Sequence, residues 1–123
     1  MKKIPLWNKQ YFTILWSWIN SFNLEKKYYS TSSIKWTEIL EPEKIITYKK
    51  RPSRANMQPN EGVVCFAKMS QTIKVFKIDE DFAKYCILST WFSLILPNID
   101  LVNSDYLKYY FISSEFNSQK DKL

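Results

Sequence analysis

Residues 62–69, GVVCFAKM, are the stretch of this chain that most strongly indicates its fold. The run is almost entirely apolar, contains β-branched residues and begins at the only glycine of the 123-residue sequence. A continuous apolar run that follows a turn residue is typical of a strand buried on both faces. We therefore predict a buried strand at residues 63–69, a turn at residues 70–72 and a second strand at residues 73–78.

Positive charge is concentrated just before this strand, where residues 48–56 read YKKRPSRAN. Residues 44–77 hold eight Lys or Arg and one acidic residue, a net charge of +7, while the whole chain carries +6. A positive excess confined to one segment favours a surface that binds a polyanion, and nucleic acid is the first candidate. Pro52 and Pro59 restrict the same region, so we predict a loop at residues 49–60.

Residues 8–22 are ambiguous between helix and strand. The spacing of their apolar residues suits an amphipathic helix, while their β-branched and aromatic content also allows a strand. The elements predicted after them are a polar connection at residues 23–27, a short strand at 28–34, a turn or short strand at 36–40 and a sheet-forming segment at 45–48.

The second half of the chain carries clearer boundary signals. The acidic residues 79–81 are predicted to cap a helical turn at residues 82–85, and residues 86–96 form the longest apolar run, predicted as one central strand. Asn103 or Ser104 is predicted to begin a helix, and Ser113 or Ser114 a second one that continues to the chain end. Residues 120–122 are predicted to be a frayed polar tail.

The composition bounds the possible functions. The length suits one domain with a single core, and two cysteines in separate apolar runs suggest free buried thiols and a reducing, cytoplasmic environment. The absence of histidine removes the commonest general base and metal ligand, and one glycine cannot form a glycine-rich phosphate loop. We see no membrane-spanning run and no export signal, and we expect no cofactor and no metal site.

Two further function classes stay open at this point. One is a small metal-dependent nuclease that uses Glu25, Glu41 or Glu43; the sequence Glu25-Lys26-Lys27 matches the end of a nuclease motif, but such triplets are common in basic chains. The other is a protein-interaction or decoy module that occupies a methyltransferase without reading DNA.

The order of several segments resembles a known family. These are PSRA at residues 52–55, GVVCFAKM at 62–69, TIKV at 72–75, LSTWFSLILP at 88–97 and SDYLKYYFISSEF at 104–116. Together they resemble the target recognition domain of type I restriction-modification specificity subunits over residues 28–118, with a weaker likeness at residues 4–7. Val63 stands where the family commonly has Asp, and Trp91 where it commonly has Gly.

The resemblance implies an α+β fold: a single target-recognition domain with a central mixed or antiparallel, partly barrel-like sheet, flanking helices and a helical C-terminus. We divide residues 1–123 into an N-terminal segment at 1–27, a β-rich body at 28–102 and C-terminal helices at 103–123. Family members normally carry two such domains separated by long helices. This chain is therefore expected to be a half-subunit, a truncated copy or an excised domain.

The implied function is sequence-specific recognition of double-stranded DNA without catalysis. The implied partners are a methyltransferase subunit and a restriction subunit, and two copies of the chain could pair to form a two-domain reader. Under this interpretation the loop and the hairpin turn face DNA, with arginines reading guanine, lysines contacting phosphate and amides pairing with adenine. The expected DNA-binding residues are Lys49, Lys50, Arg51, Ser53, Arg54, Asn56, Lys68, Gln71, Thr72 and Lys74, and Gln58 and Ser70 are weaker candidates.

Overall fold

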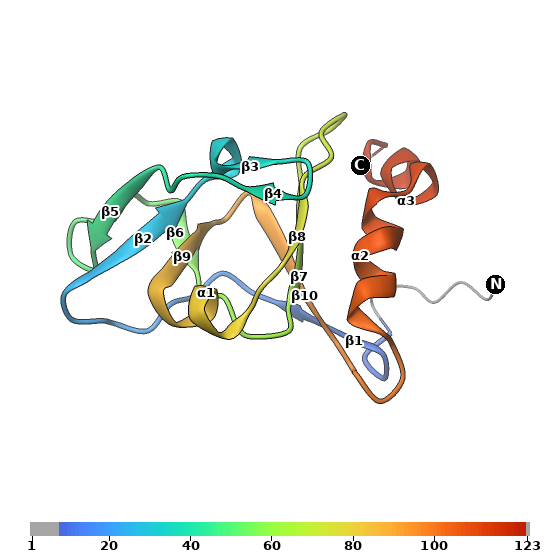
Figure 1. The fold of residues 1–123 in the computed structure, drawn as a ribbon, viewed down its shortest axis with the longest axis horizontal. Coiled ribbons are helices and arrows are strands. Elements are labelled where there is room, and N and C mark those ends of the chain that lie inside the picture. Colours follow the sequence, from blue (N-terminus) through green and yellow to red (C-terminus); the bar gives the residue numbers. More distant parts are fainter. Residues whose placement is uncertain (1–7, 123) are drawn as a thin grey trace.

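The computed structural model describes residues 8–122, so the weaker family likeness at residues 4–7 lies outside the described residues. Within this range the protein is α+β, as predicted, with two four-stranded sheets, a two-stranded sheet and helices at its C-terminal end (Figure 1). In chain order the elements are β1 (Phe12–Leu15), β2 (Glu25–Tyr29), η1 (Thr31–Ser33, a 3-10 helix), β3 (Ile34–Lys35), β4 (Glu38–Ile39), β5 (Lys44–Thr47), β6 (Ala55–Met57), β7 (Val64–Ala67), β8 (Val75–Lys77), α1 (Glu80–Tyr85), β9 (Cys86–Ser89), β10 (Phe92–Pro97), α2 (Ser104–Ile112) and α3 (Ser114–Lys120).

The two larger sheets differ in their strand directions. Sheet A has the order β1-β10-β7-β8 and is antiparallel throughout. Sheet B has the order β5-β2-β9-β6, with β2 and β9 parallel and the other pairs antiparallel. Strands β3 and β4 form a separate hairpin. The mixed and antiparallel pairing agrees with the prediction, but the sheets of residues 8–122 do not close, and the partly barrel-like arrangement is not confirmed.

The single central strand predicted at residues 86–96 is wrong, because this run forms two strands in different sheets. Strand β9 belongs to sheet B and β10 to sheet A, and the chain crosses between them at Thr90 and Trp91. The Ser89 hydroxyl accepts a hydrogen bond of 3.1 Å from the Trp91 main-chain N–H at this turn. Both strands are packed on two faces, so apolar residues continue on both sides of Ser89 and Thr90 and the pattern does not separate the two strands.

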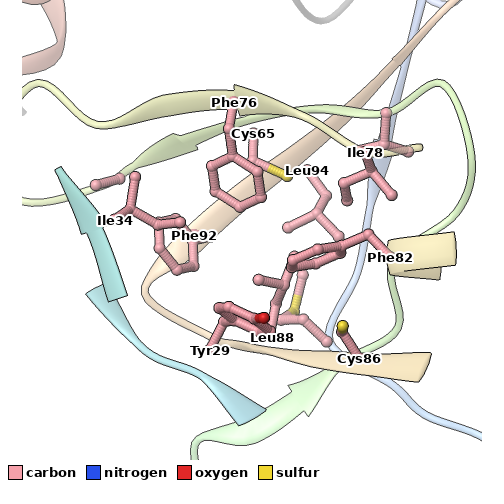
Figure 2. Close-up of a cluster of buried hydrophobic side chains, with 13 residues drawn as sticks. Tyr29, Ile34, Cys65, Phe76, Ile78, Phe82, Cys86, Leu88, Phe92 and Leu94 are labelled. Atoms are coloured by element: carbon pink, nitrogen blue, oxygen red, sulfur yellow. The ribbon is translucent and has the colours of Figure 1, made fainter. Parts of the chain in front are cut away.

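Strand β7 shows why residues 62–69 are almost entirely apolar. Alternate side chains point to opposite faces of a strand, and here both faces are covered. Cys65 and Ala67 face a core between the two sheets, where they pack with Phe76 and Phe92 (Figure 2). Val64 faces a second core between sheet A and the C-terminal helices. The buried strand predicted at residues 63–69 is thus confirmed for its central part, β7.

Helix formation at residues 8–22 is wrong, and the alternative of a strand is correct for β1. The apolar side chains of this segment are divided between two places, whereas a helix would direct them to one face. Phe12 packs beside the C-terminal helices in the second core. Ile19 and Phe22 pack against the outer face of sheet B, beside Ile46 and Ile87.

Two predicted boundaries near residue 28 also need correction. Residues 23–27 are not only a connection, because β2 begins at Glu25, and strands therefore start before the predicted β-rich body at residues 28–102. The charged start of β2 is tolerated because Lys26 extends over the Phe22 ring, with its Nζ 5.2 Å from the ring centroid. Strand 28–34 is interrupted as well, since η1 separates β2 from β3.

Residues 49–60 are not entirely a loop, because β6 forms the edge of sheet B next to β9. The remaining predicted elements of the body are confirmed: β4 within residues 36–40, β5 at 45–48 shifted by one residue, and β8 within 73–78. The helix predicted at residues 82–85 is also confirmed, but α1 begins earlier and includes the acidic Glu80 and Asp81 in its first turn. The Asp79 carboxylate caps α1 by accepting a hydrogen bond of 2.8 Å from the Phe82 main-chain N–H. Cys65 and Cys86 are free and buried.

The C-terminal helices are confirmed, with Asn103 and Ser113 as their N-caps. They lie beyond sheet A, on the side opposite sheet B (Figure 1).

The frayed tail predicted at residues 120–122 is wrong for Lys120, which is only 9% exposed. Its ammonium donates to the carbonyls of the hairpin turn between β7 and β8, which holds the end of α3 in place. None of the helices in residues 8–122 is long and apolar enough to cross a membrane.

Candidate nucleic-acid interface

The basic loop, residues 48–54, connects β5 to β6 and is held by its own side chains. The Arg51 guanidinium donates a 2.7 Å hydrogen bond to the Tyr48 carbonyl, and its Cζ lies 4.2 Å from the centroid of the Tyr48 ring. The Tyr48 ring in turn meets Phe22 edge-on at 5.7 Å. Arg51 is therefore half-buried and partly engaged in shaping the loop, in contrast to an arginine that extends freely into solvent.

Arg54 lies at the other end of the basic loop and is exposed. Its carbonyl accepts a 2.9 Å hydrogen bond from the Thr90 main-chain N–H, which ties the loop to the turn between β9 and β10. Its guanidinium carbon lies 5.5 Å from the centroid of the Trp91 ring. No acceptor among residues 8–122 engages the Arg54 guanidinium, so its five N–H donors remain available to a ligand. The Trp91 ring thus positions the Arg54 guanidinium while its N–H donors stay available.

The other predicted residues of the loop region differ in their surroundings. Lys49, Lys50 and Ser53 are exposed, as phosphate contacts need to be. Asn56 lies in β6 and its side-chain amide donates a 2.9 Å hydrogen bond to the Ser17 hydroxyl. That contact uses the amide nitrogen, so Asn56 already has a structural partner.

The hairpin turn between β7 and β8 holds the second predicted group. The Gln71 backbone has φ of 58°, and its N–H donates a 2.9 Å hydrogen bond to the Asp121 carboxylate. The Thr72 carbonyl accepts from Lys120. The half-buried Lys74 ammonium donates to the Thr31 carbonyl at 2.5 Å, so it also serves a contact within the protein.

Trp91 connects the basic loop with the start of the hairpin turn between β7 and β8. Its ring lies beside Arg54, and its carbonyl accepts a 2.9 Å hydrogen bond from the main-chain N–H of Lys68. Lys68 itself is exposed. The loop and the start of the hairpin turn therefore flank the same crossing between the sheets, whereas the tip of the hairpin lies beside α3 (Figure 1).

A polar pocket of about 280 Å³ opens beside Arg54 and Trp91. Tyr28 and Ser89, which are 3% and 1% exposed, belong to its lining, together with Glu43. Burial raises the pKa of the Tyr28 hydroxyl; a hydrogen bond with Ser89 opposes this, the nearby Glu43 carboxylate adds to it, and Arg54 opposes it. From the sequence, neither Tyr28 nor Ser89 has a place in a binding site, and Glu43 has one only under the nuclease alternative, because the three residues come from separate segments. The one available signal was Trp91, at a position where the resembled family commonly has glycine.

The described residues 8–122 contain no group of three or more acidic or cysteine side chains placed to hold a metal ion. The groups that this surface offers to a ligand are therefore cations, hydroxyls and amides. Lys and Arg side chains neutralise phosphates, and arginine can pair with guanine O6 and N7.

Comparison with known proteins adds one informative likeness. No family model matches the sequence, and no curated protein is similar to it. Among solved structures, the chain is similar to the HsdS subunit from Thermoanaerobacter tengcongensis, with 26% identity and a TM-score of 0.63. The match covers 72% of this chain and 23% of that subunit. The resemblance to specificity subunits of type I restriction systems is therefore confirmed as a likeness of fold.

Proposed function

We propose that this chain is a DNA-recognition domain of a type I restriction-modification system, which reads a short sequence in double-stranded DNA and carries out no chemistry itself. In this role it acts in the cytoplasm and directs a methyltransferase subunit and a restriction subunit to the sites that it binds. The chain spans 23% of the length of the HsdS subunit that it resembles, so one such domain accounts for part of a complete reader.

The observation that carries the proposal is the position of Arg54 on a fold of this kind. Its guanidinium lies over the Trp91 ring at the edge of the basic loop, and its backbone is tied to Thr90. A bidentate arginine–guanine pair is the commonest specific contact between proteins and DNA bases, and it requires an accessible guanidinium. Lys49, Lys50 and Lys68 are also exposed and are assigned to phosphates.

The other expected contacts take secondary roles. Ser53 is exposed and suits a phosphate oxygen. Asn56, Gln71, Thr72 and Lys74 already have partners within the protein, through either side chain or backbone. We propose that these four residues contact DNA with the groups that remain available. Arg51 holds the loop and contributes charge.

The test is selection of bound sequences from a random pool of duplex DNA, with the chain alone and with a type I methyltransferase subunit present. The proposal expects an enriched sequence that contains at least one fixed G·C pair, with tighter binding when the methyltransferase subunit is added. A single recognition domain reads a short site, so weak binding by the chain alone is also expected.

The same experiment separates the alternatives. Binding to the methyltransferase subunit without any enriched DNA sequence would identify a decoy module. Magnesium-dependent cutting of plasmid DNA by the pure chain would identify a nuclease. Either result would reject the proposed role as a DNA reader.

A further inference from the structure

The pocket beside Arg54 has a chemical character of its own. It is concave, has a volume of about 280 Å³, and has walls from the basic loop, from residues 30–32 and from the turn that carries Trp91. This volume is near the lower limit of about 300 Å³ for pockets that bind small molecules. There is room for one planar ring system but not for a base pair, so an occupant from DNA has to protrude from the duplex.

The lining of the pocket contains both a cation and a carboxylate, and this pair restricts which ligands can bind there. The Arg54 guanidinium can only donate hydrogen bonds, and the Glu43 carboxylate can only accept them. Both side chains line the same pocket as the buried Tyr28. A phosphate would meet the negative charge of Glu43, which disfavours an anion. A neutral ring with acceptors along one edge and donors along another satisfies both side chains.

Guanine is the DNA base that fits both partners in a bidentate manner. Its O6 and N7 are adjacent acceptors, which match the fork of an arginine. Its N1–H and N2–H groups are adjacent donors, which match the two oxygens of a carboxylate. The other three bases do not present two adjacent ring-edge donors of this kind. The Arg54 guanidinium carbon lies 5.5 Å from the centroid of the Trp91 ring, and no acceptor among residues 8–122 engages its N–H groups, so they can meet a base edge.

We propose that this pocket binds a single unstacked guanine base, with Arg54 donating to O6 and N7 and Glu43 accepting from N1–H and N2–H. The inference rests on the proposed function, because the expected source of the base is the DNA that the chain reads. Extracting a base from a duplex costs free energy, and this cost is smallest for a base without a pairing partner. An unpaired guanine is therefore the most sensitive probe.

The test compares the affinity of the full chain for five duplexes that share one sequence selected by the chain. One duplex is fully paired, and four carry a single bulged base, G, A, C or T, at the same position. We expect the bulged guanine to bind about tenfold more tightly than the other three bulges, as for one bidentate contact. Fluorescence anisotropy measures each dissociation constant.

Variants separate this contact from general electrostatics. Glu43→Gln keeps the shape of the side chain and removes a negative charge, so electrostatics alone would strengthen binding to every duplex. The proposal instead expects the preference for guanine to be lost. Glu41→Gln is the matched control, because Glu41 lies two residues away and does not line the pocket. It should keep the tenfold preference. Circular dichroism of both variants checks that the fold is unchanged.

Titration calorimetry with guanosine monophosphate and adenosine monophosphate distinguishes the source of the base. Equal affinity for the four bulges, with no binding of guanosine monophosphate, overturns the pocket proposal and leaves the proposed DNA-reading function standing. Selective binding of guanosine monophosphate that Glu43→Gln removes, without any duplex binding, supports the guanine pocket and overturns DNA reading. If neither the duplexes nor the nucleotides bind, both the guanine pocket and the DNA-reading function are overturned.

Discussion

The ammonium group of Lys120 donates a hydrogen bond of 3.0 Å to the main-chain carbonyl of Met69. The same ammonium also donates to the carbonyl of Thr72 and, at 3.5 Å, to that of Ala67. A lysine from the end of α3 therefore donates to the last carbonyl of β7 and to two carbonyls of the hairpin turn that follows it. The adjacent Asp121 carboxylate accepts from Gln71 in the same turn, so two successive residues hold it.

Removing this ammonium should destabilise the fold. For Lys120→Met we expect the free energy of unfolding to fall by about 2 kcal/mol, because hydrogen bonds to a charged donor are lost while the carbonyls stay largely buried. Urea denaturation followed by tryptophan fluorescence measures the change. Lys122→Met is the matched control, since Lys122 is exposed, and its stability should stay within about 0.5 kcal/mol of the parent. Equal effects of the two substitutions would contradict the role of Lys120.

The two arginines of the basic loop should differ in what they contribute to DNA binding. Arg54→Ala should cost about 1–3 kcal/mol on the preferred site and flatten the base preference at one position, because Arg54 has its donors free of the Trp91 contact. Arg51→Ala should weaken binding to all sequences alike, because it removes the support of Tyr48 together with one positive charge. Competition binding against a panel of single-base variants of the site separates these outcomes. Uniform losses for Arg54→Ala would rule out base reading by that residue.

Lys50 is expected to contact phosphate only. Its side chain is exposed, and each phosphate neutralised by a protein cation adds about 0.9 to the slope of log K against log salt. Lys50→Ala should therefore reduce this slope by about 1 and leave the base preference unchanged. Binding isotherms between about 50 and 200 mM salt measure the slope. An unchanged slope would place Lys50 away from the DNA.

Alkaline pH should destabilise the protein through its buried thiols. Burial raises the pKa of Cys86 from the ordinary value of 9.0 to about 11, and it raises the pKa of Cys65 as well. Above pH 9 the unfolded chain releases these protons and the folded protein does not, so stability is complete below that pH and falls as the pH rises towards about 11. We expect Cys86 to account for a loss of about 1–2 kcal/mol over this range.

Urea denaturation at intervals between pH 8 and 11 tests this expectation. Cys86→Ala should make the decline with pH shallower, whatever its effect on stability at neutral pH. The remaining slope comes from Cys65 and from Tyr28 and Tyr29, whose pKa values burial also raises. The same slope in Cys86→Ala and in the parent would show that Cys86 does not titrate in this way.

Local signals decided which parts of the fold the sequence could predict. Asp79 and Asn103 mark helix starts because an N-cap acts within three residues. The continuous run at residues 62–69 predicts a strand because both of its faces are covered. The turn at Thr90 and Trp91 was missed because neither residue is a turn former and because strands packed on both faces look alike in whichever sheet they lie.

The candidate site likewise has one part that the sequence predicts and other parts that it does not. Charge patterning identified the basic loop, since net charge can be counted along one segment. The pocket could not be predicted, because Tyr28, Glu43 and Ser89 meet only after β2 has paired with β9. The Lys120 contact was missed for a related reason: a lysine near a chain end has the composition of a solvated tail.

The parallel pairing of β2 with β9 has a consequence for how the protein reaches this fold. Residues 27–29 of β2 pair with residues 86–88 of β9, while β5 covers the other edge of β2 much earlier in the chain. Closing so long a loop is entropically costly, and contacts between distant residues slow folding. During synthesis, the edge of β2 that pairs with β9 has no partner strand until β9 emerges. Aggregation through that edge is the hazard of this interval, and the charged Glu25, Lys26 and Lys27 at the start of β2 oppose it.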